Sequence, residues 1–359
     1  MKNYFLSFVI VAVGFAGCKK EDQQSQNPLI DQREVHLADI QQLTFSGQNA
    51  EAYLSGDDKQ LIFQSENDST PCDQIFIMNI DGSNIHRVSN GFGKTTCSYF
   101  IPGTNKIIYS STFGGDSACP PPADFSKGYV WPIYESHDIY ISNSDGTDLK
   151  KLTDVVGYDA EATVSVDGTK IVFTSMRNGD LDIYTMNSDG SNVKQVTNEV
   201  GYDGGAFFSH DGKKIVYRGS HPKDEEEKAN YLDLLHQGIV RPTTFQLYVM
   251  DADGSNKKQL TDNEGANFAP YFTHDDKKII YASNIADTVS KRNFDLWLIN
   301  SDGTGEPERV TYNSEFNGFP MFTKDGKKLV FASNRTLTPD KEKNVRNRST
   351  NVFVAEWKD

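Results

Sequence analysis

The sequence predicts an all-β fold, a six-bladed β-propeller of four-stranded antiparallel blades, from three observations. One short pattern recurs six times between Gln41 and the last residue, with a period of roughly 45 residues. Large aromatic residues recur at one place in the second strand and one place in the third strand of each copy. The last copy lacks a fourth strand, and a segment ahead of the first copy can supply it.

Each copy contains tight turns between its strands. The third strand is followed by an Asp-Gly pair, and Asp-Gly supplies the positive backbone angle that a tight hairpin requires. These pairs are Asp81-Gly82, Asp145-Gly146, Asp189-Gly190, Asp253-Gly254 and Asp302-Gly303. The first-to-second connection is equally short, as in Ser165 to Lys170. Both kinds of connection emerge on one side of a propeller, which we call the plain face.

The aromatic columns predict the hydrophobic core. The second strands end with Phe63, Tyr109, Phe173, Tyr217, Tyr281 and Phe331. The third strands carry Phe76, Tyr140, Tyr184, Tyr248, Trp297 and Phe353. One large ring per strand fills the space between neighbouring sheets, so we assign these residues to packing.

The two ends of the repeat region predict that the ring closes. The last copy stops after a third strand near Asn351 to Ala355, and Gln41 to Thr44 reads as a fourth strand with no blade before it. If the early segment pairs with the late one, no sheet edge stays exposed. We therefore place the propeller at residues 38–359.

Two segments precede this domain. Residues 1–17 have a charged start, a short apolar run and small residues before Cys18, which is typical of a lipoprotein signal peptide. Cys18 is then the lipidated first residue of the mature chain and its membrane anchor. An ordinary secretory signal is the alternative. Residues 18–37 are polar and charged, and we expect a flexible tether.

Composition excludes some functions. The net charge is −14, and no stretch concentrates Lys and Arg among aromatics, so a nucleic-acid partner is not expected. Beyond Cys18 the chain has Cys72, Cys97 and Cys119, with no Cys-x-x-Cys pair for structural zinc. One disulfide and one free thiol are expected, and the spacing leaves the pairing open.

The repeat resembles that of a known family. Segments such as Ser165 to Phe173, followed by Asp182 to Ser191, are similar to the propeller repeat of the TolB family. That resemblance covers about residues 38–359 and implies a six-bladed, non-enzymatic propeller of the bacterial envelope. TolB proteins are periplasmic components of the Tol-Pal system with an α/β domain before the propeller, where this chain has the predicted tether.

The long connections gather on the side opposite the plain face, which we call the loop-rich face. They are the second-to-third loops at about 112–136, 220–244, 283–293 and 334–350. In the first loop, Tyr129 and Trp131 are candidate contact residues, although a structural loop is the alternative. The second loop predicts a helix between Pro222 and Gly238. We expect Ala229, Leu232 and Leu235 on the inner side of this helix and Tyr231 among the contact residues.

The start of each innermost strand offers a polar ring at the channel mouth. The aligned residues are Asn49, Thr95, Asp159, Asp203, Asn267 and Asn317, and Glu161 lies two positions after Asp159. Small oxygen-bearing side chains suit a cation, water or a polar ligand. Alternatively they cap the backbone at loop-to-strand turns. A cation at this mouth is the only cofactor that we predict.

Catalytic motifs such as Gly-x-Ser-x-Gly and His-Glu-x-x-His do not occur. Some related propellers are oligogalacturonate lyases with a histidine-held metal, and His137, His221 and His236 are weak candidates for such ligands. Our first hypothesis is a monomeric, non-enzymatic binding module, lipid-anchored to the outer membrane and facing the periplasm or the surface. Its partner is an envelope protein or peptide at the loop-rich face. The alternative hypothesis is a carbohydrate-active enzyme resembling those lyases.

Overall fold

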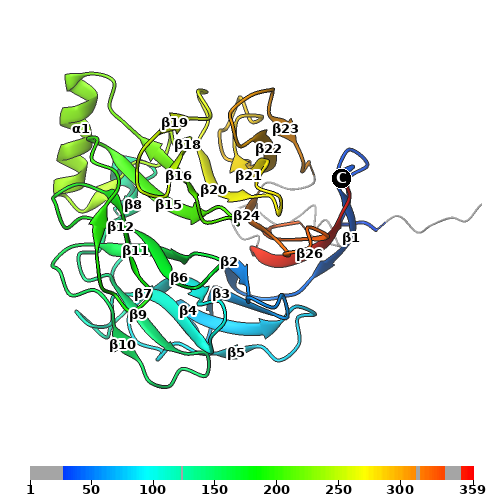
Figure 1. Ribbon diagram of the computed structural model, residues 1–359, viewed down its shortest axis with the longest axis horizontal. Coiled ribbons are helices and arrows are strands. Elements are labelled where there is room, and N and C mark those ends of the chain that lie inside the picture. The colour runs from blue at the N-terminus through cyan, green and yellow to red at the C-terminus, as the bar shows by residue number, and fades with distance from the viewer. Residues whose placement is uncertain (1–26, 123, 313–315, 336–348) are drawn as a thin grey trace, which may run out of the picture.

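Six four-stranded antiparallel sheets are arranged around a central axis in the computed structural model (Figure 1). The structure describes residues 27–122, 124–312, 316–335 and 349–359. The predicted all-β, six-bladed propeller is therefore confirmed. The predicted signal peptide and Cys18 lie outside the described residues, as does most of the loop at 334–350.

The blades follow one another along the chain, and in each blade the first strand lies nearest the axis. Blade 1 contains β2 (Gln48–Leu54), β3 (Gln60–Asn67), β4 (Thr70–Asn79) and β5 (His86–Arg87). Blade 2 contains β6 (Thr95–Phe100), β7 (Lys106–Ser111), β9 (Asp138–Asn143) and β10 (Lys150–Lys151). Blade 3 contains β11 (Asp159–Val164), β12 (Lys170–Ser175), β13 (Asp182–Asn187) and β14 (Lys194–Gln195).

The other three blades repeat this arrangement. Blade 4 contains β15 (Tyr202–Phe208), β16 (Lys214–Ser220), β18 (Gln246–Asp251) and β19 (Lys258–Gln259). Blade 5 contains β20 (Asn267–Phe272), β21 (Lys278–Ser283), β22 (Asp295–Asn300) and β23 (Glu308–Arg309). Blade 6 contains β24 (Asn317–Phe322), β25 (Lys328–Ser333), β26 (Asn351–Trp357) and β1 (Leu37–Gln42).

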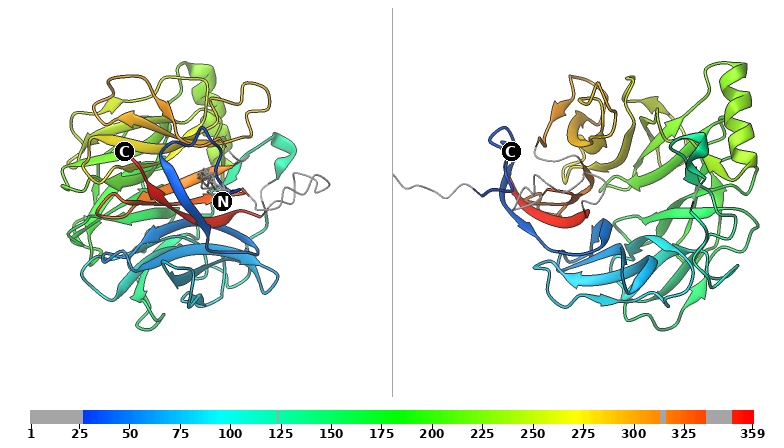
Figure 2. Two further views of the ribbon diagram at one scale, coloured as in Figure 1. Left: turned by 90° about the vertical axis from the view of Figure 1, so that its right-hand side faces the viewer. Right: turned by 180° about the vertical axis from the view of Figure 1, so that it is seen from behind.

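Blade 6 closes the ring as predicted. Strand β1 pairs antiparallel with β26, with Leu37 opposite Trp357 and Gln42 opposite Phe353. The Leu43 amide donates to the Val352 carbonyl at 2.8 Å, so the pairing continues past the strand end. The two strands lie side by side in all views (Figures 1 and 2). The closing strand begins at Leu37, four residues before the predicted Gln41.

The aromatic columns form the core between the blades. Phe63 and Phe76 stack with ring centroids 5.9 Å apart, and Tyr217 and Tyr248 stack at 5.4 Å. Phe173 in blade 3 is fully buried. Pairs of this kind recur because the strands hold the same register in every blade.

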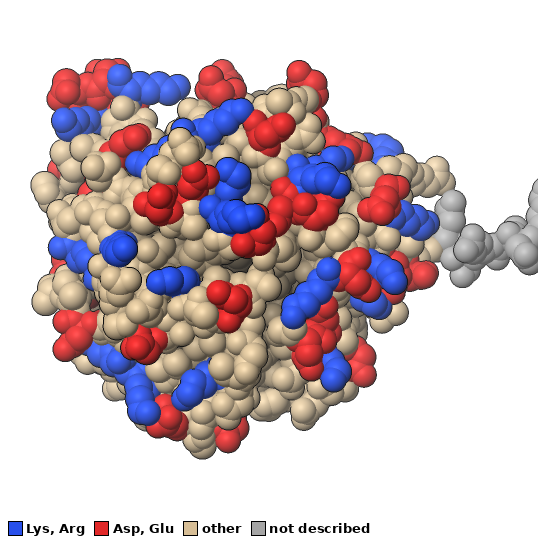
Figure 3. Space-filling model, in the orientation of Figure 1, with Lys and Arg blue, Asp and Glu red and all other residues tan. Residues whose placement is uncertain are grey.

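The Asp-Gly turns are tight, as expected. Gly146 has a φ of 83°, and a Cβ there would lie 2.6 Å from the Val88 carbonyl oxygen, so the turn excludes a side chain. On the face seen in Figure 1, side chains of both charge signs are interspersed (Figure 3). That face therefore offers no basic footprint for nucleic acid.

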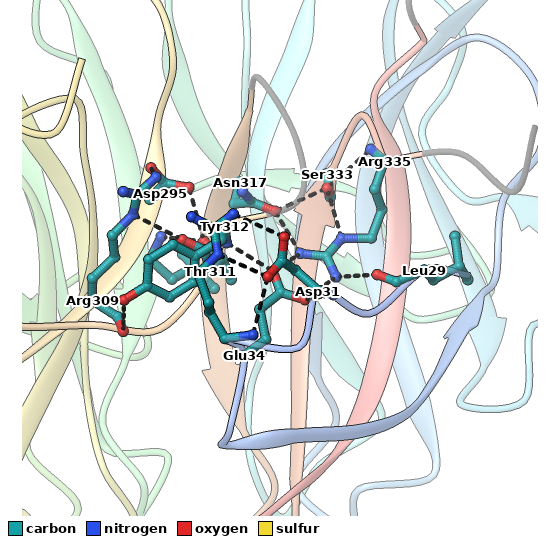
Figure 4. Close-up of polar contacts among 12 residues, drawn as sticks. Leu29, Asp31, Glu34, Asp295, Arg309, Thr311, Tyr312, Asn317, Ser333 and Arg335 are labelled. Carbon is teal, nitrogen blue, oxygen red and sulfur yellow. Dashed lines mark hydrogen bonds and ion pairs between the residues drawn. The ribbon is translucent and has the colours of Figure 1, made fainter. Parts of the chain in front are cut away.

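The predicted flexible tether requires a correction, because residues 27–36 are packed on the propeller. Leu29 and Glu34 are 3% and 2% exposed. Glu34 forms an ion pair with Arg335 at 3.1 Å, and both side chains are fully buried (Figure 4). A few apolar and charged groups are enough to fix this segment, because blade 6 supplies their partners. Residues 27–36 therefore belong to the packed domain.

The two large insertions meet on the loop-rich face. Helix α1 (Glu225–His236) begins after Asp224, whose side chain accepts from the Glu227 amide at 2.8 Å. The predicted helix is thus confirmed, but Leu234 and Leu235 are its buried residues. Of the three residues expected on the inner side, Leu235 is buried, whereas Ala229 is exposed and Leu232 is half-buried.

Short strands join the insertions of blades 2 and 4. Strand β8 (Trp131–Pro132) pairs with β17 (Ile239–Val240), which follows α1. The blade 2 insertion also contains a 3-10 turn, η1 (Phe125–Lys127), and a disulfide joins its Cys119 to Cys72 in β4. Cys97 is the free thiol. The two insertions therefore form one connected structure that reaches across blade 3.

A capped cavity at the centre of the propeller

Every innermost strand is interrupted by a β-bulge at the same place. The strand register shifts there, for example between Ala50 and Tyr53 of β2. One residue in each bulge has a left-handed φ of 49° to 57°: Glu51, Cys97, Glu161, Gly205, Ala269 and Phe319. For a residue other than glycine this conformation costs about 1–3 kcal/mol, so the flanking strand pairing must impose it.

These six bulge residues line one cavity of about 320 Å³ on the propeller axis. Its floor on the plain side is an aromatic cluster, in which Tyr53 lies 5.5 Å from Phe207 between ring centroids. Tyr99 and Tyr271 extend the cluster. These rings therefore lie on the side of the cavity that is nearer the plain face.

The other end of the cavity is covered by the insertions. Trp131, Pro132, Ile133, Tyr134 and His137 line it, and we call residues 131–137 the cap. The pairing of β8 with β17 attaches the cap to blade 4. The sequence thus predicted correctly that the insertions gather on one face, whereas the joint cover over the channel mouth was not predicted.

An ion pair forms one wall of the cavity. Glu161 pairs with Arg218 of β16, and Glu161 also accepts from the Tyr202 hydroxyl at 2.8 Å and the Gly205 amide at 2.9 Å. The Arg218 guanidinium lies over the Trp131 ring at 5.3 Å from the centroid. With these contacts the Glu161 charge is fully compensated by the protein.

Glu51 lies in the same cavity, where the Cys97 side chain hydrogen-bonds its carboxyl and the Arg218 charge attracts it, but it forms no ion pair with another described residue. The two cations that line the cavity are engaged elsewhere, Arg218 with Glu161 and Lys94 with Asp73. Burial raises the pKa of the Glu51 carboxyl to about 7, and the Glu161 charge adds to the rise. Glu51 is therefore the surplus acidic group of this cavity.

His137 stands where the cap meets the cavity. The residue is 4% exposed, and neither ring nitrogen has a hydrogen-bond partner among the residues that the structure describes. Burial lowers the pKa of His137 to about 3, so the ring is neutral. Its ring packs edge-on against Tyr158, with centroids 5.5 Å apart. A neutral imidazole has one donor and one acceptor nitrogen, and a buried one without partners is unusual.

The predicted polar ring requires a correction in its geometry. Its members do begin the innermost strands, but their side chains are 0–3% exposed and face the interior of the blades: Asn49, Thr95, Asp159, Asp203, Asn267 and Asn317. Of the predicted set, Glu161 alone lines the cavity. The binding role of the others stays a prediction without support from their placement.

Hydrogen bonds explain why these side chains turn inward. Asp159 pairs with Arg177 of its own blade at 3.1 Å, and Asp203 accepts from His221 at 3.0 Å. Burial raises the pKa of Asp203, and the hydrogen bond with His221 opposes that rise. The alternative interpretation, that these residues satisfy the backbone and neighbouring strands, therefore fits their positions better.

The predicted contact residues of the loop-rich face lie in different surroundings. Tyr129 is 62% exposed. Trp131 is half-buried in the cap, where its Nε1 donates to the Tyr129 hydroxyl at 3.1 Å. Tyr231 attaches α1 to blade 3, because its hydroxyl donates to Asp180 at 2.5 Å. Tyr129 is therefore the freest of the three for a partner.

The three candidate histidines do not lie together. His137 lines the central cavity, His221 lines a separate hollow beside α1, and His236 is exposed at the end of the helix. In the described parts of the chain, no three His, Cys, Asp or Glu side chains are arranged to hold a metal ion. A cation at the channel mouth stays a prediction.

Arg218 was not predicted from the sequence as part of a site. The sequence does contain an indication of its role: Arg218 is a charged residue in a second strand, and the aligned residues of other blades, such as Thr174 and Ala282, are neutral. Glu51 stands two positions after Asn49, in the same alignment column as Glu161, but Glu161 was the residue of that column to which a binding role was assigned. Glu51 lies in a bulge, whereas Arg218 lies in the second strand of blade 4, and both line the cavity.

Comparisons with known proteins agree with this architecture. Residues 133–237 match the family model of the TolB beta propeller domain. TolB from Acinetobacter baumannii has a TM-score of 0.55 at 20% identity, over 84% of this chain and 64% of that chain. This chain thus spans less than two thirds of that protein. No curated protein sequence is similar enough to count as a match.

Two further solved structures have the same fold. A putative TolB from Agrobacterium tumefaciens has a TM-score of 0.56 at 17% identity, over 89% of this chain and 97% of that chain. An oligogalacturonate lyase from Vibrio parahaemolyticus has a TM-score of 0.51 at 11% identity, over 88% and 93%. The chain is a closed six-bladed β-propeller with a capped central cavity. Within that class, residues 133–237 are similar to the TolB beta propeller domain.

Proposed function

We propose that this protein is a non-enzymatic binding module of the bacterial cell envelope that recognises a protein or peptide partner on its loop-rich face. The observation that carries this proposal is the difference between the two faces. The plain face has only tight turns, while the insertions, the cap and the exposed Tyr129 lie on the other. Irregular segments held by a rigid scaffold are the usual place of recognition.

The envelope location rests on the sequence and on the likeness to TolB propellers. The predicted signal peptide ends just before Cys18, whose lipidation would tether the propeller to the outer membrane, facing either the periplasm or the surface. Among the described residues, no helix combines the length and apolar character needed to cross a membrane. Metabolic labelling with a palmitate analogue tests the anchor, because Cys18→Ala should abolish both the label and the membrane association.

The loop-rich face can be tested by site-specific photocrosslinking in intact cells. A crosslinking residue at Tyr129, which is 62% exposed on the loop-rich face, should capture one specific envelope protein. The matched control is the same crosslinker at Val166, which is 42% exposed in a turn of the plain face. Equal capture from both positions, or capture from Val166 alone, would overturn the assignment of the face.

A carbohydrate-active enzyme is the second candidate, and the acidic capped cavity is the observation in its favour. The lyase alternative needs histidines that share a metal, and His137, His221 and His236 are separated in the structure. Binding to a partner is therefore the better-supported function. Stoichiometric transition metal in the purified protein, lost in His137→Ala, would reverse this preference.

A further inference from the structure

We propose that the central cavity binds a small organic ammonium ion, with its positive group at Glu51 and its apolar body against Phe268 and Phe319. This site is independent of the partner surface proposed above, because it lies beneath the cap. The charges that face the cavity, the composition of its walls and its size all support this assignment.

Among the charged groups that face the cavity, the Glu51 carboxylate is not balanced by a positive group. Glu161 and Arg218 cancel each other, and Lys94 is held by Asp73. Cys97, beside Glu51 in the ring of bulge residues, carries no charge because burial raises its pKa far above the usual range. Ionised Glu51 thus gives the cavity a net charge of about −1. A single cation would restore neutrality and remove the electrostatic cost of burying the Glu51 carboxylate.

The walls suit an organic cation better than a bare metal ion. In the ring of blades, Glu51 stands between Cys97 of blade 2 and Phe319 of blade 6. Phe319 and Phe268 pack edge to face with centroids 5.6 Å apart, and both line the cavity. Metal ions require several oxygen or nitrogen ligands, whereas a carboxylate beside aromatic rings is the arrangement that binds alkylammonium groups.

In the same cavity, aromatic rings already surround one cationic group, that of Arg218. The Arg218 guanidinium lies over Trp131, Tyr202 and Phe245 at 5.3, 5.4 and 5.6 Å from the ring centroids. His137 offers a second contact, since neither ring nitrogen has a partner within the described part of the chain and the neutral ring can accept a hydrogen bond from an ammonium group.

The size and the cap favour a free small molecule. The cavity volume of about 320 Å³ falls at the lower end of the range typical of small-molecule sites. Trp131, Pro132 and Tyr134 line it on the side of the channel mouth, so a ligand enters past the cap.

Calorimetric titration of the purified full chain tests the proposal, with n-butylammonium as the probe. Saturable binding is expected, and n-butanol, a neutral molecule of similar size, should bind at least about tenfold more weakly. This comparison uses only the wild-type chain. Equal binding of the two probes, or no saturable binding of butylammonium, would overturn the proposal.

The variant Glu51→Gln tests the residue assignment. It keeps the side-chain shape and should weaken butylammonium binding about tenfold or more. Glu225→Gln, at an exposed helix position, is the matched control and should bind as the wild type does. Circular dichroism verifies that both variants are folded. Unchanged binding by folded Glu51→Gln would contradict the site.

Binding should also weaken on acidification, because Glu51 must be ionised. The titratable and charged groups around Glu51 are Tyr53, Asp73, Lys94, Cys97, His137, Glu161 and Arg218. Burial, the largest cause, and the neighbouring charges place its pKa at about 7. Butylammonium affinity should therefore be higher at pH 8 than at pH 5.5 in the wild type. An affinity independent of pH in this range would contradict the role of Glu51.

Discussion

At the scale of single residues, the pair Glu34–Arg335 shows how a short polar segment is fixed to the propeller. Arg335 donates through Nη2 to Glu34 at 3.1 Å and to Asn317 at 3.0 Å. Glu34 accepts in addition from the Tyr312 amide at 2.8 Å (Figure 4). Both charges are paired and hydrogen-bonded, which is the condition under which buried ions are tolerated.

Removing one member of this pair should be costly. Glu34→Gln leaves the buried Arg335 charge without its partner, so the free energy of unfolding should fall by about 3–5 kcal/mol. Urea titration followed by circular dichroism measures the change. As a control, Lys213→Gln removes an exposed pair with Asp211 and should cost less than about 1 kcal/mol. Equal effects of the two variants would show that the burial of Glu34 contributes nothing.

The stability of the protein should depend on pH through Glu51. Its pKa is raised from 4.5 to about 7 on folding, so between these values the folded chain keeps a proton that the unfolded chain has lost. This group therefore makes the free energy of unfolding fall as pH rises from 4.5 to 7.

Glu51→Gln cannot lose that proton. Its stability relative to the wild type should therefore increase between pH 4.5 and 7, by at most about 3 kcal/mol, and stay constant above. Urea titrations at several pH values provide the measurement. A difference between Glu51→Gln and the wild type that does not change over this pH range would mean that Glu51 has an ordinary pKa.

At the scale of elements, the disulfide between Cys72 and Cys119 attaches the blade 2 insertion to blade 1. The insertion carries the cap, and its stretch around η1 is exposed. Since the disulfide joins points 47 residues apart, it restricts the unfolded chain as well as the insertion itself.

Breaking the disulfide should loosen the insertion more than the propeller. In Cys119→Ser, trypsin should cleave after the exposed Lys127 several-fold faster, while the circular dichroism spectrum of the sheets is retained. Mass spectrometry identifies the cut. Cys97→Ser changes the free thiol and should be cleaved like the wild type. If Cys119→Ser is cleaved no faster than Cys97→Ser, the disulfide does not hold the insertion.

The sequence predicts the elements well, because strand alternation, Asp-Gly turns and aromatic columns are local and repeat in every blade. Which residues line the cavity was harder to predict, because each innermost strand contains a bulge. A bulge inserts one residue, so the strand face that Asn49 occupies is not the face that Glu51 occupies. Alignment alone does not reveal which column then faces the axis.

Two other features depend on contacts between distant segments. The pairing of β8 with β17 joins insertions about 108 residues apart that share no repeat pattern with the blades. Residues 27–36 are polar enough to suggest a tether, and only the position of Arg335 across the closed ring makes Glu34 a buried partner. Composition and periodicity contain no signal for either contact.

At the scale of the whole molecule, the ring is held closed by one strand from the far end of the chain. Strand β1 covers the edge of β26, with Ile40 2% exposed in the core. Without β1, blade 6 would present an unpaired hydrophobic edge, and such edges recruit other chains.

Shortened chains can separate the contribution of β1 from that of residues 27–36. A chain starting at residue 37 keeps β1 and should stay monomeric, although it loses the Glu34–Arg335 pair. A chain starting at residue 45 loses β1 and should self-associate, as measured by light scattering after size exclusion. A synthetic peptide of residues 37–44 should restore the monomer by adding the missing strand, whereas the same peptide with Ile40→Asp should not. A monomeric chain from residue 45 with unchanged unfolding free energy would show that the ring does not need its closing strand.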